Sequence, residues 1–272
     1  MKKRFIILID FSEYSGNLIR YACDWGRQAN VELLLVHQTI VLAPALTDKD
    51  SRQQIAQHTN DEALYELKTL AKALIPPTMQ VSFSVSESHL EFTLSKLLEE
   101  PFDNLIFVGI KGTGLLKKIF LGSVALEVID STKNIIVAMP KGIATYSHKK
   151  IFVAVTEKYP LNLLALNKFF NFIASENTSI TFFYLAKPKE KTKNIEKYLI
   201  DLTVLFAGRF NTNFAIYEGS TALADIRKVI NNKIDEILIV QKGSRLLTDQ
   251  LFRKFLINEL VYEGQTPLIV LP

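Results

Sequence analysis

The sequence has little cysteine and no long apolar run, and both absences exclude a class of protein. Among its 272 residues Cys23 is the single cysteine, so no disulfide can form within the chain. A disulfide-stabilised secreted domain is excluded, and a reducing cytoplasm suits the chain. Nowhere do about 18 apolar residues follow one another, as a membrane-spanning helix requires. We therefore expect a soluble protein without a membrane partner.

The apolar run at the start of the chain is too short for a signal peptide. Phe5 to Ile9 follows three basic residues and ends at Asp10. The apolar region of a signal peptide has about 7–15 residues. We interpret the run as a strand buried on both faces, and we expect the protein to be cytoplasmic.

Neither sign of charge dominates the sequence. The chain has 32 Lys and Arg against 28 Asp and Glu, a net charge of +4. No basic block is long enough for a nucleic-acid interface, so we expect no nucleic-acid partner. The length allows one large domain or two smaller ones.

The first half alternates short β-rich runs with segments of helical period. Strands are expected over residues 5–9, 31–36, 81–85, 105–108 and 135–138, and helices after Ser12 as N-cap and over residues 47–75, 90–99 and 122–131. Serines alternate with Val81, Phe83 and Val85, which predicts a half-buried strand at a sheet edge. The alternation of strands and helices predicts a parallel sheet with helices on both faces.

The second half repeats this pattern. Residues 151–155, 237–240 and 268–271 correspond to the first, fourth and fifth strands of the first half, and residues 195–206 to its long helix. The expected fold class is α/β, with two tandem Rossmann-like domains, each a five-stranded parallel sheet with helices on both faces. We place these domains at residues 1–145 and 146–272.

Candidate ligand-binding residues follow three strands of the first half. In a doubly wound sheet, ligands bind at the carboxyl ends of the strands, where the strand order reverses. The segments at these ends are Asp10-Phe11-Ser12, Gln38 after His37, and a run that contains Gly109, Lys111, Gly112, Gly122, Ser123, Val124 and Ala125. Glycines let the backbone approach a phosphate closely, and the helix that begins near Gly122 favours anions at its N-terminus. This combination predicts a polyphosphate site.

The glycine-rich run alone is weak support for such a site, because the same glycines could simply form turns in a surface loop. It is not a P-loop, since no Gly-Lys-Ser/Thr follows at the required spacing. It is not a dinucleotide fingerprint either, since it follows the fourth strand and not the first.

The spacing Gly109-x2-Gly112-x9-Gly122-Ser123 resembles the nucleotide-binding signature of the ATP-binding universal stress proteins. Residues 6–12 are similar to that family's first strand and its Asp-x-Ser, and residues 35–37 to the end of its second strand. The resemblance covers essentially the whole chain as two tandem copies, with the strong motif in the first copy only. It implies the adenine nucleotide alpha hydrolase-like form of the Rossmann-like fold.

The resemblance also implies a site for ATP, or for ADP or AMP, in the first domain. It implies Asp10 beside the adenosine, in a loop shared with Phe11 and Ser12, and the backbone of Gln38 facing adenine. The remaining implied contacts are Gly109, Lys111 and Gly112 around ribose and phosphates, and Gly122, Ser123 and Val124 at the phosphates, commonly with a divalent ion such as Mg²⁺ or Mn²⁺. Ala125 stands where that family frequently has a hydroxyl residue, which removes one phosphate donor.

The second domain departs from the motif. Thr156 stands in place of Asp10, and Arg253, Lys254 and Phe255 stand near the position of the Gly-Ser pair. Their side chains would fill the space of a phosphate, so we expect no ATP there. Capture of another anion by Lys242, Arg245, Arg253 and Lys254 is the alternative.

Three functions are open at this point. In the first, ATP bound to the first domain of a cytoplasmic stress protein shifts its conformation or its choice of partner. In the second, the same pocket is a slow ATPase or phosphotransferase, for which Asp10 is the sole carboxylate placed nearby. In the third, the chain is a nucleotide-free scaffold in which the tandem repeat imitates a homodimer along residues 135–138 and 268–271. Two such chains could also pair as a homodimer.

Overall fold

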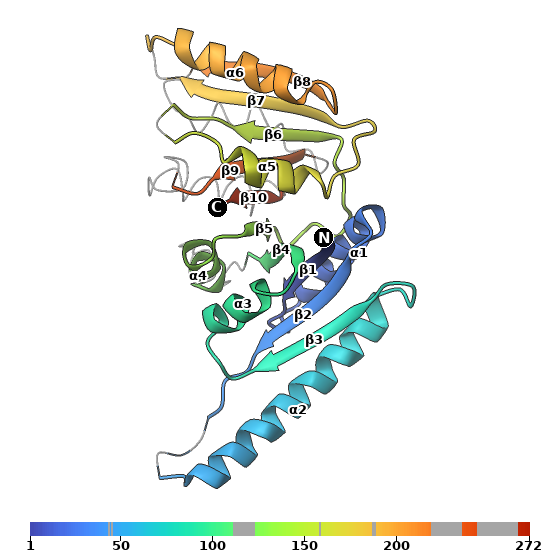
Figure 1. Ribbon diagram of the computed structural model, residues 1–272. Coiled ribbons are helices and arrows are strands. Elements are labelled where there is room, and N and C mark those ends of the chain that lie inside the picture. Colours follow the sequence, from blue (N-terminus) through green and yellow to red (C-terminus); the bar gives the residue numbers. More distant parts are fainter. Residues whose placement is uncertain are drawn as a thin grey trace.

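The strands of the chain form one continuous sheet. The computed structural model describes residues 1–42, 44, 46–110, 123–157, 159–186, 189–218, 236–243 and 266–272 (Figure 1). Its strands are β1 (Lys2–Leu8), β2 (Glu32–Gln38), β3 (Val81–Ser86), β4 (Phe102–Gly109), β5 (Ile135–Met139), β6 (Lys150–Ala154), β7 (Ser179–Ala186), β8 (Asn211–Glu218), β9 (Glu236–Gln241) and β10 (Leu268–Leu271). They lie in the order β3-β2-β1-β4-β5-β10-β9-β6-β7-β8. The order within β6 to β10 is therefore the mirror image of the order within β1 to β5.

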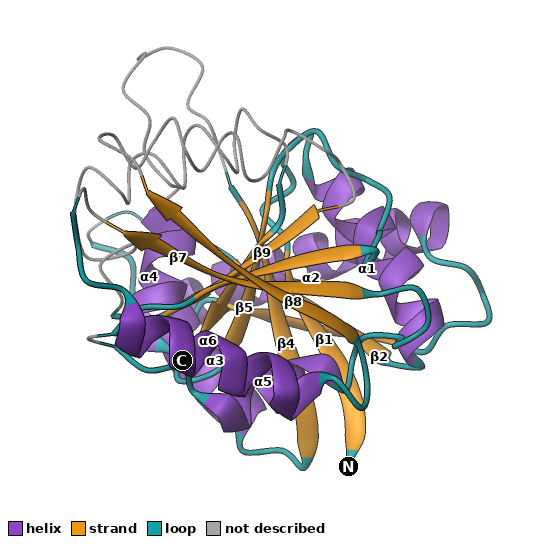
Figure 2. Cartoon of the chain, turned by 90° about the horizontal axis from the view of Figure 1, so that it is seen from above, coloured by secondary structure: helices purple, strands orange, loops and turns teal. Residues whose placement is uncertain are grey.

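The two halves meet at an antiparallel strand pair. Every other pair of neighbouring strands is parallel, whereas β5 and β10 run antiparallel, with Val137 opposite Ile269. This pairing joins the two strands that the sequence predicts at the contact between the halves. Seen from above, β7 and β8 cross the direction of β1 and β4 (Figure 2), as the accumulated twist of a wide sheet requires.

Helices cover both faces of the sheet. They are α1 (Ser15–Ala29), α2 (Lys49–Leu74), α3 (Leu90–Leu98), α4 (Ser123–Ser131), α5 (Leu163–Phe170) and α6 (Lys193–Phe206). The core on one face includes residues of α1, α2, α5 and α6, and the core on the other includes residues of α3 and α4. In β1, Phe5 and Ile7 face the first core while Ile6 and Leu8 face the second. A strand buried on both faces explains why this run is apolar throughout.

Most predicted elements are confirmed, including β3 at an edge of the sheet. The prediction of Ser12 as the N-cap of the first helix is wrong: α1 begins at Ser15, and its N-cap residue Tyr14 makes no side-chain cap hydrogen bond. The long helix begins at Lys49, where the Asp48 side chain accepts a hydrogen bond from the Ser51 backbone N–H. Among the helices of the described ranges, none combines the length and hydropathy that crossing a bilayer requires.

An aromatic cluster packs the halves together beside the strand joint. The indole of Trp25, from α1, stacks on Tyr146 with ring centroids 4.7 Å apart. Its Nε1–H donates to the carbonyl of Phe172, in the second half, at 2.8 Å. Trp25 is fully buried, and burial raises the pKa of the neighbouring Tyr21 and Tyr146 phenols. The first half thus contacts the second through α1 as well as through β5.

Candidate functional site

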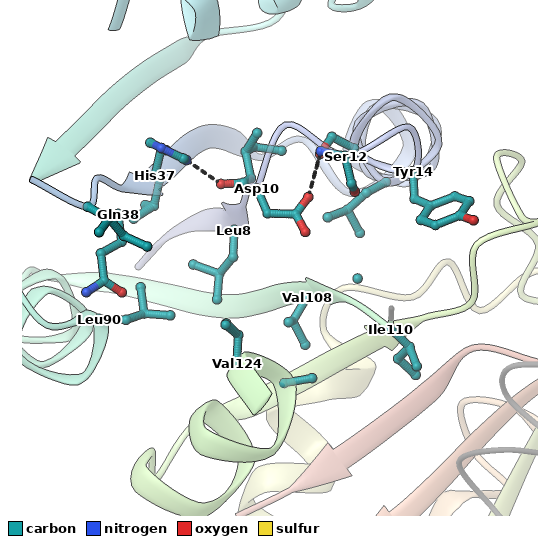
Figure 3. Close-up of a pocket in the computed structure, with 17 residues that line it drawn as sticks. Leu8, Asp10, Ser12, Tyr14, His37, Gln38, Leu90, Val108, Ile110 and Val124 are labelled. Atoms are coloured by element: carbon teal, nitrogen blue, oxygen red, sulfur yellow. Dashed lines mark hydrogen bonds between the residues drawn. The ribbon is translucent and has the colours of Figure 1, made fainter. Parts of the chain in front are cut away.

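A cavity of about 440 Å³ lies where the strand order of the first half reverses, between β1 and β4. After β1 the chain continues to β2 on one side of this point, and after β4 it continues to β5 on the other side. The helices that follow β1 and β4 therefore lie on opposite faces of the sheet. The lining residues come from the ends of β1, β2 and β4 and the starts of α1, α3 and α4 (Figure 3): Leu8, Ile9, Asp10, Ser12, Tyr14, Ser15, Leu18, Val36, His37, Gln38, Ile40, Leu90, Val108, Gly109, Ile110, Val124 and Ala125. A few polar groups thus stand in an otherwise apolar wall, which is typical of a small-molecule site.

The turn after β1 is held by the Asp10 carboxylate. Its Oδ1 accepts hydrogen bonds from the Ser12 backbone N–H at 2.9 Å and from the Ser15 hydroxyl at 3.1 Å. Phe11 adopts a φ of 54°, in the left-handed region that bulky residues seldom occupy. These contacts explain why Ser12 does not cap α1: its N–H is directed to Asp10, and the chain completes another turn before the helix begins.

The end of β2 forms a second wall of the cavity. The His37 Nδ1 lies 2.8 Å from the carbonyl oxygen of Ile9. Because a carbonyl only accepts, Nδ1 carries the proton of this contact, and in the neutral ring Nε2 keeps the lone pair. The Phe11 ring packs on the same imidazole, with the two ring centroids 4.4 Å apart. Gln38 follows at the end of the strand, and Figure 3 shows its side chain extending toward Leu90.

The third wall is the end of β4 together with the first turn of α4. A Cβ placed on Gly109 would meet no described atom within 4 Å, and the φ of Gly109 is not in the left-handed region. Neither packing nor backbone conformation within the described chain therefore requires glycine here. Val124 and Ala125 line the cavity from the first turn of α4, where backbone N–H groups leave a helix N-terminus partly positive. Open space beside a helix N-terminus suits an anionic ligand.

The structure brings together part of the predicted site. Six of the predicted residues line the cavity: Asp10, Ser12, Gln38, Gly109, Val124 and Ala125. Phe11 does not line it but packs on His37, which does. Lys111, Gly112 and Gly122 lie outside the described residues, and Ser123 is described only as the first residue of α4. Contact of any of these residues with a nucleotide stays a prediction.

Several lining residues escaped the sequence analysis, among them Tyr14, Ile40 and Leu90. Leu90 is the first residue of α3, so inspection of the first helical turn after each strand, as well as the strand end, would have found it. Tyr14 lies in the turn that Asp10 reshapes, and the sequence pattern gives no signal for that turn. The side chain of Ile40 is 77% exposed at the rim of the cavity.

The corresponding point of the second half is filled by a side chain. Gly109 is paired with Met139, and Gln241 with Leu271, at equivalent places in the two strand orders. The Gln241 amide accepts from the Asn162 backbone N–H at 2.9 Å and donates to the Pro272 carbonyl at 2.6 Å. Gln241 is buried, and Asn162 is the N-cap of α5. This side chain thus connects the end of β9 with the N-cap of α5 and the end of β10, at the position where the first half has Gly109 and no described atom within 4 Å of its added Cβ.

Two predictions for the second half can be compared with this geometry. The alternative of an anion site that includes Lys242 stays a prediction; in the described residues the Lys242 Nζ donates to the carbonyls of Asp130 at 2.7 Å and Thr132 at 3.1 Å, at the C-terminus of α4. Arg245, Arg253, Lys254 and Phe255 lie outside the described residues. The described obstruction is Gln241, which the sequence analysis did not single out.

Comparison with known proteins gives the same fold. A universal stress protein from Archaeoglobus fulgidus is 18% identical, with a TM-score of 0.66 over 98% of this chain and 97% of that one. A functionally unknown protein from Pseudomonas aeruginosa is 13% identical, with a TM-score of 0.61 over 99% and 92%. The cytoplasmic domain of a prokaryotic cation chloride cotransporter is 11% identical, with a TM-score of 0.54 over 99% and 95%. At such identities these likenesses show the fold alone.

Sequence comparison identifies the family. A search among curated proteins finds no match for the chain. The sequence profile of the universal stress protein family matches residues 1–137, which contain the strands β1 to β4, most of β5, and the whole cavity. The chain therefore belongs to the universal stress protein family.

Proposed function

We propose that this chain is a cytoplasmic universal stress protein that binds ATP, or ADP or AMP, in the cavity of its first half and regulates a stress-response partner according to the bound nucleotide. Family membership supports the role in stress response. The observation that carries the nucleotide proposal is the cavity at the reversal of the strand order, where no described atom lies within 4 Å of a Cβ placed on Gly109. Its volume of about 440 Å³ falls in the range of small-molecule sites.

The lining suits the parts of an adenine nucleotide. The apolar side chains of Val36, Ile40 and Leu90, near the end of β2, would receive the base, with the backbone of Gln38 at its edge. The Asp10 carboxylate would accept a hydrogen bond from a ribose hydroxyl. The space over Gly109 leads to the first turn of α4, where the phosphates would meet helix N–H groups.

A divalent ion, if bound, would be held mainly by the phosphates. Among the described residues no group of three histidine, cysteine or acidic side chains is placed to hold a metal. Asp10 is the one carboxylate that lines the described cavity. Mg²⁺ usually keeps several waters and binds through one or two carboxylates plus phosphate oxygens, so a dedicated protein cage is not needed.

The second half would serve as a built-in partner that binds no nucleotide. The antiparallel β5–β10 pair and the mirrored strand order support an intramolecular pseudo-dimer of two tandem domains. The Gln241 side chain supports the absence of a nucleotide in the second crevice, because it occupies the position that Gly109 leaves open.

The test begins with the purified full chain. Denaturation followed by chromatography and mass spectrometry identifies any carried nucleotide, and calorimetric titration with ATP and Mg²⁺ measures binding to the emptied protein. We expect about one adenine nucleotide per chain, as one open crevice implies. The variant Gly109→Val should lose binding, whereas Gly208→Val should keep it. Gly208 is a matched control because a Cβ on it also meets no described atom within 4 Å, but it lies after α6. Equal ATP affinity in both folded variants, or no binding by the wild type, would refute the proposal.

A further inference from the structure

The described wall of the cavity has a negative side chain and no strongly basic one. Asp10 supplies a carboxylate, and none of the described lining residues is Lys or Arg. The phosphates of a nucleotide carry several negative charges, which this wall meets only with partly positive helix N–H groups. A basic side chain next to the wall therefore bears on which ligands the cavity accepts.

The pairing of β4 with β5 places Lys141 near Gly109. Gly109 lies opposite Met139, and the Ile110 backbone N–H donates to the Met139 carbonyl at 2.9 Å. Lys141 follows Met139 by two residues, which span at most about 7 Å of chain. The backbone of Lys141 therefore lies close to the strand end that borders the cavity.

Two contacts hold Lys141 against the start of α1. The Asn17 side-chain amide donates to the Lys141 carbonyl at 2.9 Å. The Lys141 Nζ lies 5.6 Å from the centre of the Tyr14 ring, which is a cation–π distance. Tyr14 lines the cavity, and Figure 3 shows it at the end opposite Leu90. The ammonium group thus lies beside the end of the cavity that is remote from the proposed place of the base.

We propose that Lys141 contacts the phosphate chain of the bound nucleotide and makes the cavity select nucleoside di- and triphosphates over nucleosides. This inference rests on the proposed function, because it requires a nucleotide in the cavity. The Lys141 side chain is exposed, and its flexible stem lets the ammonium turn from the Tyr14 ring to a phosphate oxygen. The resulting hydrogen bond is charge-assisted, and adenosine offers no partner for it.

The selecting charge comes from the segment that joins the two halves. The profile of the family matches residues 1–137, whereas Lys141 lies between β5 and β6. In the same segment Tyr146 stacks on Trp25 of α1. The proposal therefore gives this segment two tasks, which are to pack the joint and to complete the site of the first half.

Calorimetric titration of the full chain with ATP and with adenosine tests this proposal. Lys141→Met keeps the side chain long and removes its charge, so we expect ATP affinity to fall about tenfold and adenosine affinity to stay unchanged. Lys141→Arg keeps the charge and should largely restore ATP binding. Lys149→Met is the matched control and should bind ATP like the wild type, because Lys149 is an exposed lysine of the same segment that directly precedes β6. Circular dichroism confirms that the variants are folded.

Chemical labelling adds a readout other than affinity. Saturating ATP should slow the acetylation of Lys141 by an amine-reactive reagent, measured by mass spectrometry, whereas adenosine should not, and Lys149 should react equally with either ligand. Equal labelling of Lys141 with and without ATP would overturn the inference. Equal ATP affinity in wild type and Lys141→Met, or an equal loss for ATP and adenosine, would overturn it while the proposed function stands. A wild type that binds no ATP would overturn both.

Discussion

The two halves of the molecule have the same strand order but opposite treatment of the crevice between their first and fourth strands. At the end of the fourth strand the first half has Gly109, with no described atom within 4 Å of an added Cβ, and the second half has Gln241, whose amide bonds to Asn162 and Pro272. The strand orders are alike, and in the described residues the two crevices differ in their side chains. The comparison teaches that one strand order can hold a cavity in one half and a hydrogen-bonded side chain at the equivalent position of the other.

The first strands of the halves differ in the same way. Asp10 accepts hydrogen bonds from Ser12 and Ser15 and keeps a carboxylate at the cavity wall. At the equivalent place the Thr156 hydroxyl donates a hydrogen bond to the Tyr159 carbonyl at 3.0 Å. The Asp10 carboxylate at the cavity wall is a hydrogen-bond acceptor that a ligand could use, whereas the Thr156 hydroxyl donates within its own turn. Thr156 and Gln241 thus both bond to groups of the second half itself.

The largest effect is expected when the second-half residue is placed in the first half. Gly109→Gln puts a side chain where the nucleotide would lie, and relieving the clash between them costs about 1–3 kcal/mol, or roughly five- to 150-fold in ATP affinity. Calorimetric titration measures the affinity, with Gly208→Gln as control. Unchanged affinity in a folded Gly109→Gln protein would show that the nucleotide does not pass over Gly109.

The reciprocal change should affect stability and not binding. Gln241→Ala leaves the half-buried Asn162 backbone N–H without its partner and removes one of the two donors to the Pro272 carbonyl, at a cost of about 1–3 kcal/mol in the free energy of unfolding. Urea denaturation measures the loss, with Gln57→Ala on the surface of α2 as control. We expect no ATP binding to the opened second crevice, because Thr156 still stands there. Binding of a second nucleotide would show that Gln241 alone closes that site.

A smaller effect is expected from the contact that crosses between the halves. Lys242 caps the C-terminus of α4, and a cation at a helix C-terminus contributes about 0.3–1 kcal/mol. Lys242→Met should lower the hydrogen-exchange protection of α4 while leaving α3 unchanged. Lys133→Met, in the adjacent loop, is the control. Equal protection of α4 in both variants would show that the second half does not hold this helix.

The smallest expected effect is a dependence of the joint on pH. Burial lowers the pKa of His148, which stacks on Tyr146 at the joint, against an opposing hydrogen bond to the backbone of Glu176. Because the folded pKa is below the unfolded value of about 6.5, protonation favours the unfolded chain. This contribution to stability is complete above pH 6.5 and is lost as pH falls below it. Stability curves of wild type and His148→Phe should converge above that pH and diverge below it, while His58→Phe, on the exposed face of α2, should follow the wild type.

Four strands of the first half were readable from the sequence because each contains an apolar run that is buried on both faces. β1, β2, β4 and β5 were predicted within a few residues, and so was the contact of β5 with β10. α5, β7 and β8 were not assigned as elements. The alternation in β8 is weak because its outer residues are exposed polar side chains mixed with Phe214, so neither a period of two nor a continuous apolar run stands out.

The site was predictable where it depends on topology and unpredictable where it depends on side-chain contacts. Asp10, Gln38 and Gly109 follow from the rule that ligands bind at strand ends. The start of α1 does not follow from any local pattern, because it is set by the bonds of Asp10 to Ser12 and Ser15 across the turn. The role of Gln241 depends equally on contacts with residues 79 and 31 positions away, which no local pattern records.

The position of Trp25 provides an intrinsic spectroscopic probe. It is the one tryptophan of the chain, and its indole N–H is bonded to Phe172 of the second half while its ring lies flat against Tyr146. Separation of the halves would expose this indole to water and shift its fluorescence to longer wavelength. The emission maximum therefore reports the state of the joint directly, without any label, while ligands are added to a cavity at the other end of the same helix.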